Sequence, residues 1–171
     1  MKKVIVLVIA VIYLASIVAV NFFGLKVPVF EGTTYVKDIV LNAVVHPDIN
    51  GDGSGKTLAP EDPETKTRTI GGENYYLFPF TFKPAPEGKS YTAENIEENP
   101  NTVYLDITVY PFNATNDKIE FIFDGAATAG SVVFVEEKRT IVFLKPFTAS
   151  VFLRALDGSG VETKPFYIRF Q

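Results

Sequence analysis

Alternation of apolar and polar residues dominates the chain beyond residue 26. It is clearest in residues 103–110, 118–123, 151–155 and 166–170, where every second side chain is apolar. Successive side chains of a β-strand point to opposite faces, so each segment is predicted to be a strand with one buried face. Shorter patterns of the same kind predict further strands at 35–45, 75–82, 131–135 and 140–144.

Clusters of turn-forming residues separate these segments, for example Asp124-Gly125, Lys145-Pro146 and residues 157–160. Short strands broken every ~8–12 residues by turns are typical of an antiparallel sandwich, in which a second sheet covers the apolar face of the first. Beyond residue 26 no stretch of a dozen residues shows apolar positions at helical spacing, so the predicted fold class is all-β. Residues 46–68 and 84–102 are rich in loop-forming residues and are predicted to be long loops.

Two of the predicted strands also allow the buried face to be assigned. In residues 35–45 the inward set is Ile39, Leu41, Ala43 and Val45. In residues 75–82 the inward set is Phe78, Phe80 and Phe82. The outward set of the same strand is then available to contact a protein partner or a sugar ring, and comprises Tyr75, Leu77 and Pro79.

The first 26 residues have a different character. Lys2 and Lys3 precede an uncharged apolar stretch that starts at Val4 and continues to Leu25. As a helix it would measure about 33 Å, close to the ~30 Å hydrocarbon core of a bilayer. Residues 1–26 are therefore predicted to be a transmembrane signal anchor. Cations before the helix favour a cytoplasmic N-terminus, so a single-pass protein of the cell membrane is predicted, with residues 27–171 as its extracytoplasmic domain.

A cleaved signal peptide is the alternative for this segment. Such peptides have an apolar region of only ~7–15 residues and end at a small-x-small site. Ala19-Val20-Asn21 is a poor site, and Leu14-Ala15-Ser16 lies inside the apolar stretch. An uncleaved anchor is therefore favoured, and cleavage would make the domain a secreted one.

Composition narrows the classes of function. The chain has 171 residues, a formal net charge of −4 and no cysteine. This length suits one domain with a substantial core. Nucleic-acid binding is not expected, because the chain has no basic stripe. The absence of cysteine excludes disulfides, thiolate metal sites and a cysteine nucleophile.

One acidic segment resembles a calcium-binding loop. Asp48, Asn50 and Asp52 alternate oxygen-bearing side chains before Gly53, as in the first half of a hand-type loop. The closing glutamate is missing, because Ala59 stands at the twelfth position. Two interpretations remain, a weak calcium site formed by the three oxygen-bearing residues and a plain solvated turn. No other cofactor is predicted.

Neither a nucleotide site nor a catalytic centre is indicated. Gly55-Lys56-Thr57 ends like a phosphate loop, but Asn50 stands where the first glycine belongs, and Pro60 and Pro63 prevent the required helix. His46 is the sole histidine, and no Gly-x-Ser-x-Gly elbow accompanies it. We expect His46 at the surface or at a strand edge, and we predict that the protein is not an enzyme.

The C-terminal half has a distinctive order of turns. Its features are Pro111 followed by Asn113-Ala114-Thr115-Asn116, then Leu144-Lys145-Pro146 leading to Thr148-Ala149, and a last hairpin turning at Asp157-Gly158. In these features residues 102–170 resemble the bacterial Ig-like domains of the group 2 type, which occur in surface adhesins and cell-wall proteins. The resemblance implies a non-catalytic, extracytoplasmic Ig-like β-sandwich.

Together these observations predict a membrane-anchored, non-catalytic Ig-like module for cell-surface binding, adhesion or structural support. Its partners would be the membrane, through the N-terminal helix, and an unidentified protein or surface polymer. An alternative is a bitopic accessory subunit, whose helix packs against other membrane proteins. A secreted binding module is the expectation if the N-terminal segment is cleaved.

Overall fold

The computed structural model describes residues 32–49, 51, 53–92, 99–124, 128–135 and 139–171. These residues form ten β-strands, namely β1 Asp38–His46, β2 Lys56–Leu58, β3 Lys66–Ile70, β4 Glu73–Phe80, β5 Thr102–Tyr110, β6 Ile119–Phe123, β7 Val132–Val135, β8 Thr140–Phe143, β9 Phe147–Ala155 and β10 Phe166–Phe170. Within the described part of the chain, no helix is both long and apolar enough to cross a membrane. The predicted anchor over residues 1–26 lies outside the described residues.

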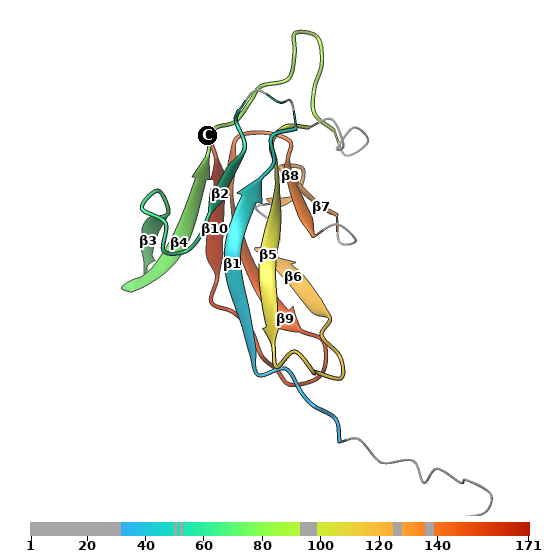
Figure 1. Ribbon diagram of the computed structural model, residues 1–171. Helices are drawn as coiled ribbons and strands as arrows, with labels where there is room; N and C mark the ends of the chain where they lie inside the picture. The colour runs from blue at the N-terminus through green and yellow to red at the C-terminus, as the bar shows by residue number, and fades with distance from the viewer. Residues whose placement is uncertain (1–31, 50, 52, 93–98, 125–127, 136–138) are drawn as a thin grey trace, which may run out of the picture. The chain divides into compact units, whose positions relative to one another are not determined.

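The strands form two five-stranded sheets (Figure 1). The first sheet has the order β2-β1-β5-β8-β7, and the second has the order β3-β4-β10-β9-β6. The predicted all-β, two-sheet sandwich is therefore confirmed. Its pairing is not wholly antiparallel, because β4 and β10 run parallel. The chain leaves β4, enters the first sheet as β5 and only later returns beside β4, and such a crossover connection permits parallel pairing.

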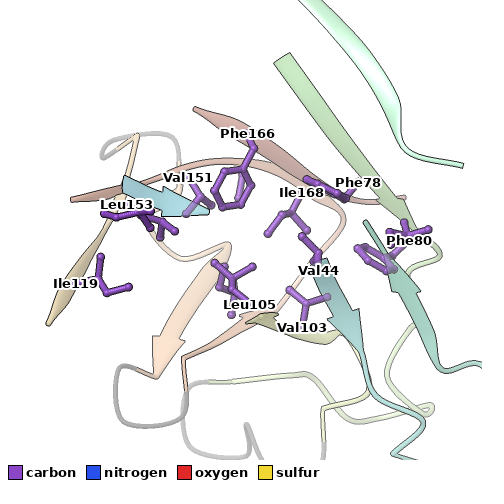
Figure 2. Packing of buried hydrophobic residues seen from close by; sticks show 14 of the residues in the cluster. Val44, Phe78, Phe80, Val103, Leu105, Ile119, Val151, Leu153, Phe166 and Ile168 are labelled. Atoms are coloured by element: carbon purple, nitrogen blue, oxygen red, sulfur yellow. The ribbon is translucent and has the colours of Figure 1, made fainter. Parts of the chain in front are cut away.

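Apolar side chains from both sheets fill the space between them (Figure 2). Val44 and Val103 of the first sheet and Phe78 and Ile168 of the second are all completely buried. Removing one such side chain from water stabilises the fold by about 1.5–3 kcal/mol. The inward faces of β5, β9 and β10 follow the predicted alternation, with Leu105, Val151, Leu153, Ala155, Phe166, Ile168 and Phe170 all buried.

A β-bulge changes the buried face of β1. The register with β5 shifts between Leu41 and Ala43. A bulge places two residues of one strand opposite one residue of its partner, so the alternation of faces restarts one position later. Val44 and His46 are consequently buried, while Val45, which the alternation predicted to be inward, is only partly buried.

The two predicted loops differ from each other. Residues 46–68 contain β2 and the beginning of β3, which the sequence pattern did not reveal because these strands are short and polar. In residues 84–102 the described part has no strand before β5 starts at Thr102. Buried Asn99 and Asn101 instead anchor the end of this loop through hydrogen bonds to Phe143 and Lys83.

Asp157 connects the segment before β1 to the turn after β9. Its Oδ2 accepts a hydrogen bond from the N–H of Val36 at 2.5 Å, and its Oδ1 accepts one from the N–H of Ser159 at 2.9 Å. Hydrogen bonding by the Ser159 side chain is the largest cause that lowers the pKa of Asp157 below 3.8. The N–H of Val36 lowers it further, while partial desolvation opposes both effects.

We expect the Asp157 carboxylate to make stability depend on pH. A depressed folded pKa means that the stabilisation is present above 3.8 and is lost as the pH falls through the lower folded value. Asp157→Asn should lower the melting temperature near neutral pH, and the loss should be smaller at an acidic pH below the folded pKa, where the carboxyl is protonated in both the folded and the unfolded state. Asp117→Asn, at an exposed residue, is the control. An equal loss at both pH values would contradict a role for the charge.

Candidate functional site

His46 lies in the core and not at the surface as the sequence predicted. Its exposed fraction is 5%, because the β1 bulge turns it inward. Its Nδ1 lies 2.8 Å from the carbonyl oxygen of Thr102, and its ring meets Phe80 and Phe170 edge-on at 5.5 and 5.6 Å between centroids. A carbonyl oxygen only accepts, so we assign the proton to Nδ1. The arrangement gives this imidazole a packing role.

The predicted calcium ligands are only partly described. Asn50 and Asp52 lie outside the described residues, whereas Asp48 is described and exposed. Its Oδ2 accepts a hydrogen bond from the N–H of Gly53 at 2.8 Å, as acidic residues do in plain turns. The part of the chain with described positions contains no group of three or more His, Cys, Asp or Glu side chains placed to hold a metal. A calcium site at these three residues stays a prediction.

A groove crosses the outward face of the second sheet, over β3, β4, β10 and β9. It encloses about 790 Å³. We call it the outer groove, and its principal lining residues are Arg68, Leu77, Asp124, Thr148, Tyr167 and Arg169. The inward side chains of β4 and β10 are core residues, so the groove has a rigid base.

Aromatic rings position Arg68 at this groove. Its guanidinium carbon lies 4.6 Å from the centroid of the Tyr167 ring, which is a cation–π geometry. The Tyr75 ring meets Tyr167 edge-on, with 6.0 Å between centroids. The Tyr75 hydroxyl donates to Glu73 at 3.1 Å, and this hydrogen bond is the largest cause that raises the pKa of Tyr75. Tyr75 therefore stays a neutral ring that supports the Arg68–Tyr167 pair.

A second arginine lies on the same face. Arg169 follows Tyr167 by two positions on β10, and side chains at that spacing share a face. Its Nε donates to the Oγ1 of Thr148 at 3.2 Å. Within the described residues, neither Arg68 nor Arg169 forms an ion pair with a carboxylate. The outer groove thus carries positive charge that is not neutralised by a direct pair.

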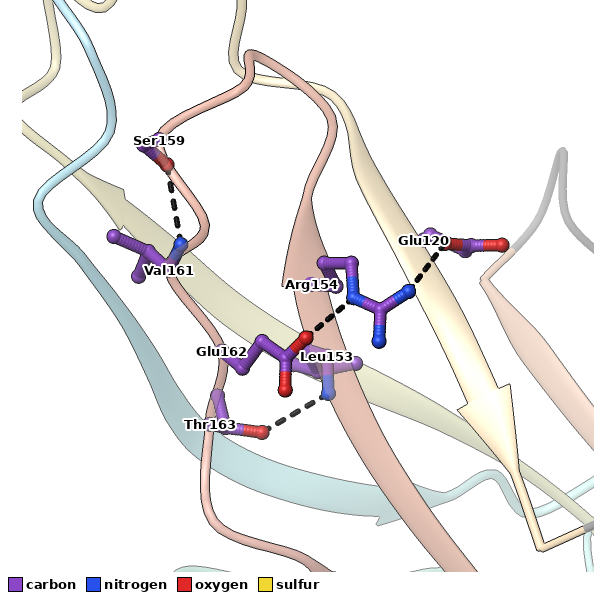
Figure 3. A network of polar contacts seen from close by, with 7 residues as sticks. All are labelled: Glu120, Leu153, Arg154, Ser159, Val161, Glu162 and Thr163. Carbon is purple, nitrogen blue, oxygen red and sulfur yellow. Dashed lines mark hydrogen bonds and ion pairs between the residues drawn. The ribbon is translucent and has the colours of Figure 1, made fainter.

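Arg154 shows the contrasting, neutralised arrangement on the same sheet. Its Nε lies 2.5 Å from Glu162 and its Nη1 lies 3.8 Å from Glu120 (Figure 3). Beside it, the N–H of Leu153 donates to the Oγ1 of Thr163 at 3.0 Å, which holds the following segment against β9. The charge of Arg154 is therefore balanced by carboxylates of the same chain.

A further hollow lies between the sheets beside β1. β2 pairs only with the end of β1, from Val44 to His46, so the beginning of β1 has no described strand on that side. The hollow encloses about 600 Å³, and its lining includes Ile39, Leu41, Pro60, Tyr76 and Phe166. These walls are mainly apolar and aromatic and have no charge pattern that identifies a ligand.

Only some residues of the outer groove could be placed on its face from the sequence. Alternation placed Tyr167 and Arg169 on the face opposite the core residues of β10, and it placed Tyr75 outward as well. Arg68 was in a segment predicted to be a loop. Its position over Tyr167 depends on the pairing of β3 with β4, which is a tertiary feature.

No known family model matches the sequence, and a comparison with curated proteins finds no match.

Proposed function

We propose that the chain is a membrane-anchored, extracytoplasmic module with an Ig-like sandwich that acts by binding at the cell surface and not by chemistry. The apolar segment at residues 1–26 supports the anchor, and the order of turns in residues 102–170 supports the Ig-like assignment. The observation that carries the binding function is the outer groove, where Arg68 and Arg169 face solvent without a carboxylate partner among the described residues.

The polar groups of the interior support the same proposal. Within the described residues, every buried side-chain nitrogen or oxygen has a hydrogen-bond partner. The sole histidine is enclosed by aromatic rings. Polar groups committed to packing in this way stabilise a scaffold, whereas catalysis needs an acid, base or nucleophile within reach of a substrate.

Cysteine labelling tests the location, because the chain has no cysteine of its own. We expect Phe112→Cys, at a side chain that is 82% exposed, to react with a membrane-impermeant maleimide in intact spheroplasts. Lys2→Cys, before the apolar segment, should react only after lysis. The cysteine-free parent chain is the control for unspecific labelling.

Other experimental outcomes would instead indicate the opposite orientation, a secreted module or an accessory subunit. Labelling of Lys2→Cys but not Phe112→Cys in intact spheroplasts would overturn the proposed orientation. Release of Phe112→Cys into the medium at the mass of a shortened chain would show a secreted module. Co-purification of a membrane protein at fixed stoichiometry in mild detergent would identify an accessory subunit instead.

A further inference from the structure

We propose that the outer groove binds an anionic glycopolymer, a carbohydrate chain whose negative groups are carboxylates or phosphates. This inference rests on the proposed function in that it names the ligand of the binding module. Lys66 and Arg68 pair with Leu77 and Tyr75 of β4, and directly opposed residues in a sheet share a face. Arg169 lies on the same face from β10, and of these three cations Arg68 and Arg169 line the outer groove itself.

Arg68 and Arg169 are held in position before an anion binds. A guanidinium offers a planar fork of donors that fits a carboxylate or a phosphate with two parallel hydrogen bonds. Arg68 is stacked on Tyr167, and Arg169 is hydrogen-bonded to Thr148, so less side-chain freedom has to be lost on binding. Asp124 of the lining and Glu73, which accepts a hydrogen bond from Tyr75, form no ion pair with them.

The polar lining favours a carbohydrate over an acidic peptide. Thr148 and Ser150 supply hydroxyls, and Asp124 supplies a carboxylate that can accept a hydrogen bond from a sugar hydroxyl. Leu77, at the base of the groove, is only 5% exposed and offers little apolar surface to a ligand.

Strand addition to β10, at the centre of the groove, is unavailable to a peptide. β10 is paired with β4 on one side and with β9 on the other, so its backbone groups are already hydrogen-bonded. A peptide that recognises a sheet by β-augmentation needs an unpaired edge. Along β10 the groove therefore offers side chains to its ligand and no free backbone hydrogen-bonding groups.

The test measures binding of the full chain, kept in a non-ionic detergent, to four immobilised polymers. Polygalacturonate presents carboxylates, phosphorylated dextran presents phosphates, unmodified dextran is neutral, and polyglutamate is an acidic peptide. We expect one or both anionic glycopolymers to bind in a salt-sensitive manner and unmodified dextran not to bind. The two anionic arms identify which negative group the groove accepts.

Variants connect the binding to the groove. Arg68→Ala/Arg169→Ala should weaken binding at least about tenfold per arginine removed. Arg68→Lys/Arg169→Lys should give an intermediate loss, because lysine keeps the charge but not the fork. Arg154→Ala removes an equal charge from the same sheet, outside the groove, and should bind like the parent. Melting temperatures close to that of the parent confirm that each variant is folded.

Three results would overturn the proposal. The first is an absence of binding to both anionic glycopolymers. The second is an equal loss from Arg154→Ala, which would indicate general electrostatic attraction. The third is polyglutamate binding as well as the glycopolymers do, which would point to an acidic peptide. None of these results depends on membrane location, so failure here is distinct from a failure of the labelling experiment.

Discussion

Replacement of Phe170 by alanine is expected to destabilise the protein by about 3–5 kcal/mol, because it removes a large ring from a close-packed core. Phe170 is 1% exposed and lies on a strand with neighbours on both sides. Its ring packs against Phe143, Phe80 and His46, with centroid distances of 4.6, 5.3 and 5.6 Å. The cavity left by alanine would be lined by side chains of both sheets, which limits collapse.

Urea unfolding of the parent and variant measures this loss as a shift of the midpoint at constant slope. Phe112→Ala is the matched control, because the same ring is removed from a position that is 82% exposed. We expect the control to change stability by less than about 0.5 kcal/mol. A similar loss in both variants would show that Phe170 is not part of a packed core.

Replacement of Asn101 by alanine is expected to destabilise the protein by about 2–4 kcal/mol, because two partly buried backbone groups of Lys83 lose their hydrogen-bond partner. Its Oδ1 accepts from the N–H of Lys83 at 2.7 Å, and its Nδ2 donates to the carbonyl oxygen of Lys83 at 2.8 Å. The same Nδ2 also lies 3.1 Å from the Oδ1 of Asn99, whose Nδ2 donates to the carbonyl oxygen of Phe143 at 3.0 Å. The Asn101 amide thus joins the two ends of the long loop over residues 84–102.

The matched variant for Asn101 is Asn113→Ala, at an exposed position in a turn. Chemical unfolding should show a loss for Asn101→Ala and almost none for the control. Asn101→Asp should also be destabilising, because a carboxylate cannot donate to the carbonyl oxygen of Lys83. Amide hydrogen exchange should report faster opening around residues 83–92 in both Asn101 variants. Unchanged exchange there would contradict the anchoring role.

The core and the outer groove are connected through β10. Phe166, Ile168 and Phe170 point into the core, while Tyr167 and Arg169 point outward from the same strand. Packing of the inward rings therefore holds the outward side chains in a fixed position. Loss of binding in a Phe170 variant would be an indirect effect, which is why the binding test uses surface arginines.

Much of the strand content was present in local sequence patterns. The pattern at residues 166–170 predicts β10 within its observed bounds, and the inward residues of β9 are buried as their spacing indicates. On β5 the predicted inward residue Leu105 is buried, while Ile107 and Val109 are partly buried. Alternation suffices here because a strand with one apolar face can bury it only against another layer. The short strands β2 and β3 were not predicted. In β3 all five residues are exposed, so the strand shows no apolar face.

Local spacing alone predicts that strands with one apolar face recur along the chain past its N-terminal segment, since that property depends on residues two positions apart. Which strands pair with one another follows from contacts that only the folded chain makes. That pairing set β4 parallel to β10, placed the bulge that turns His46 inward, and brought Arg68 over Tyr167. These features depend on contacts between residues distant in the chain, whose free energies act only once both sheets are assembled.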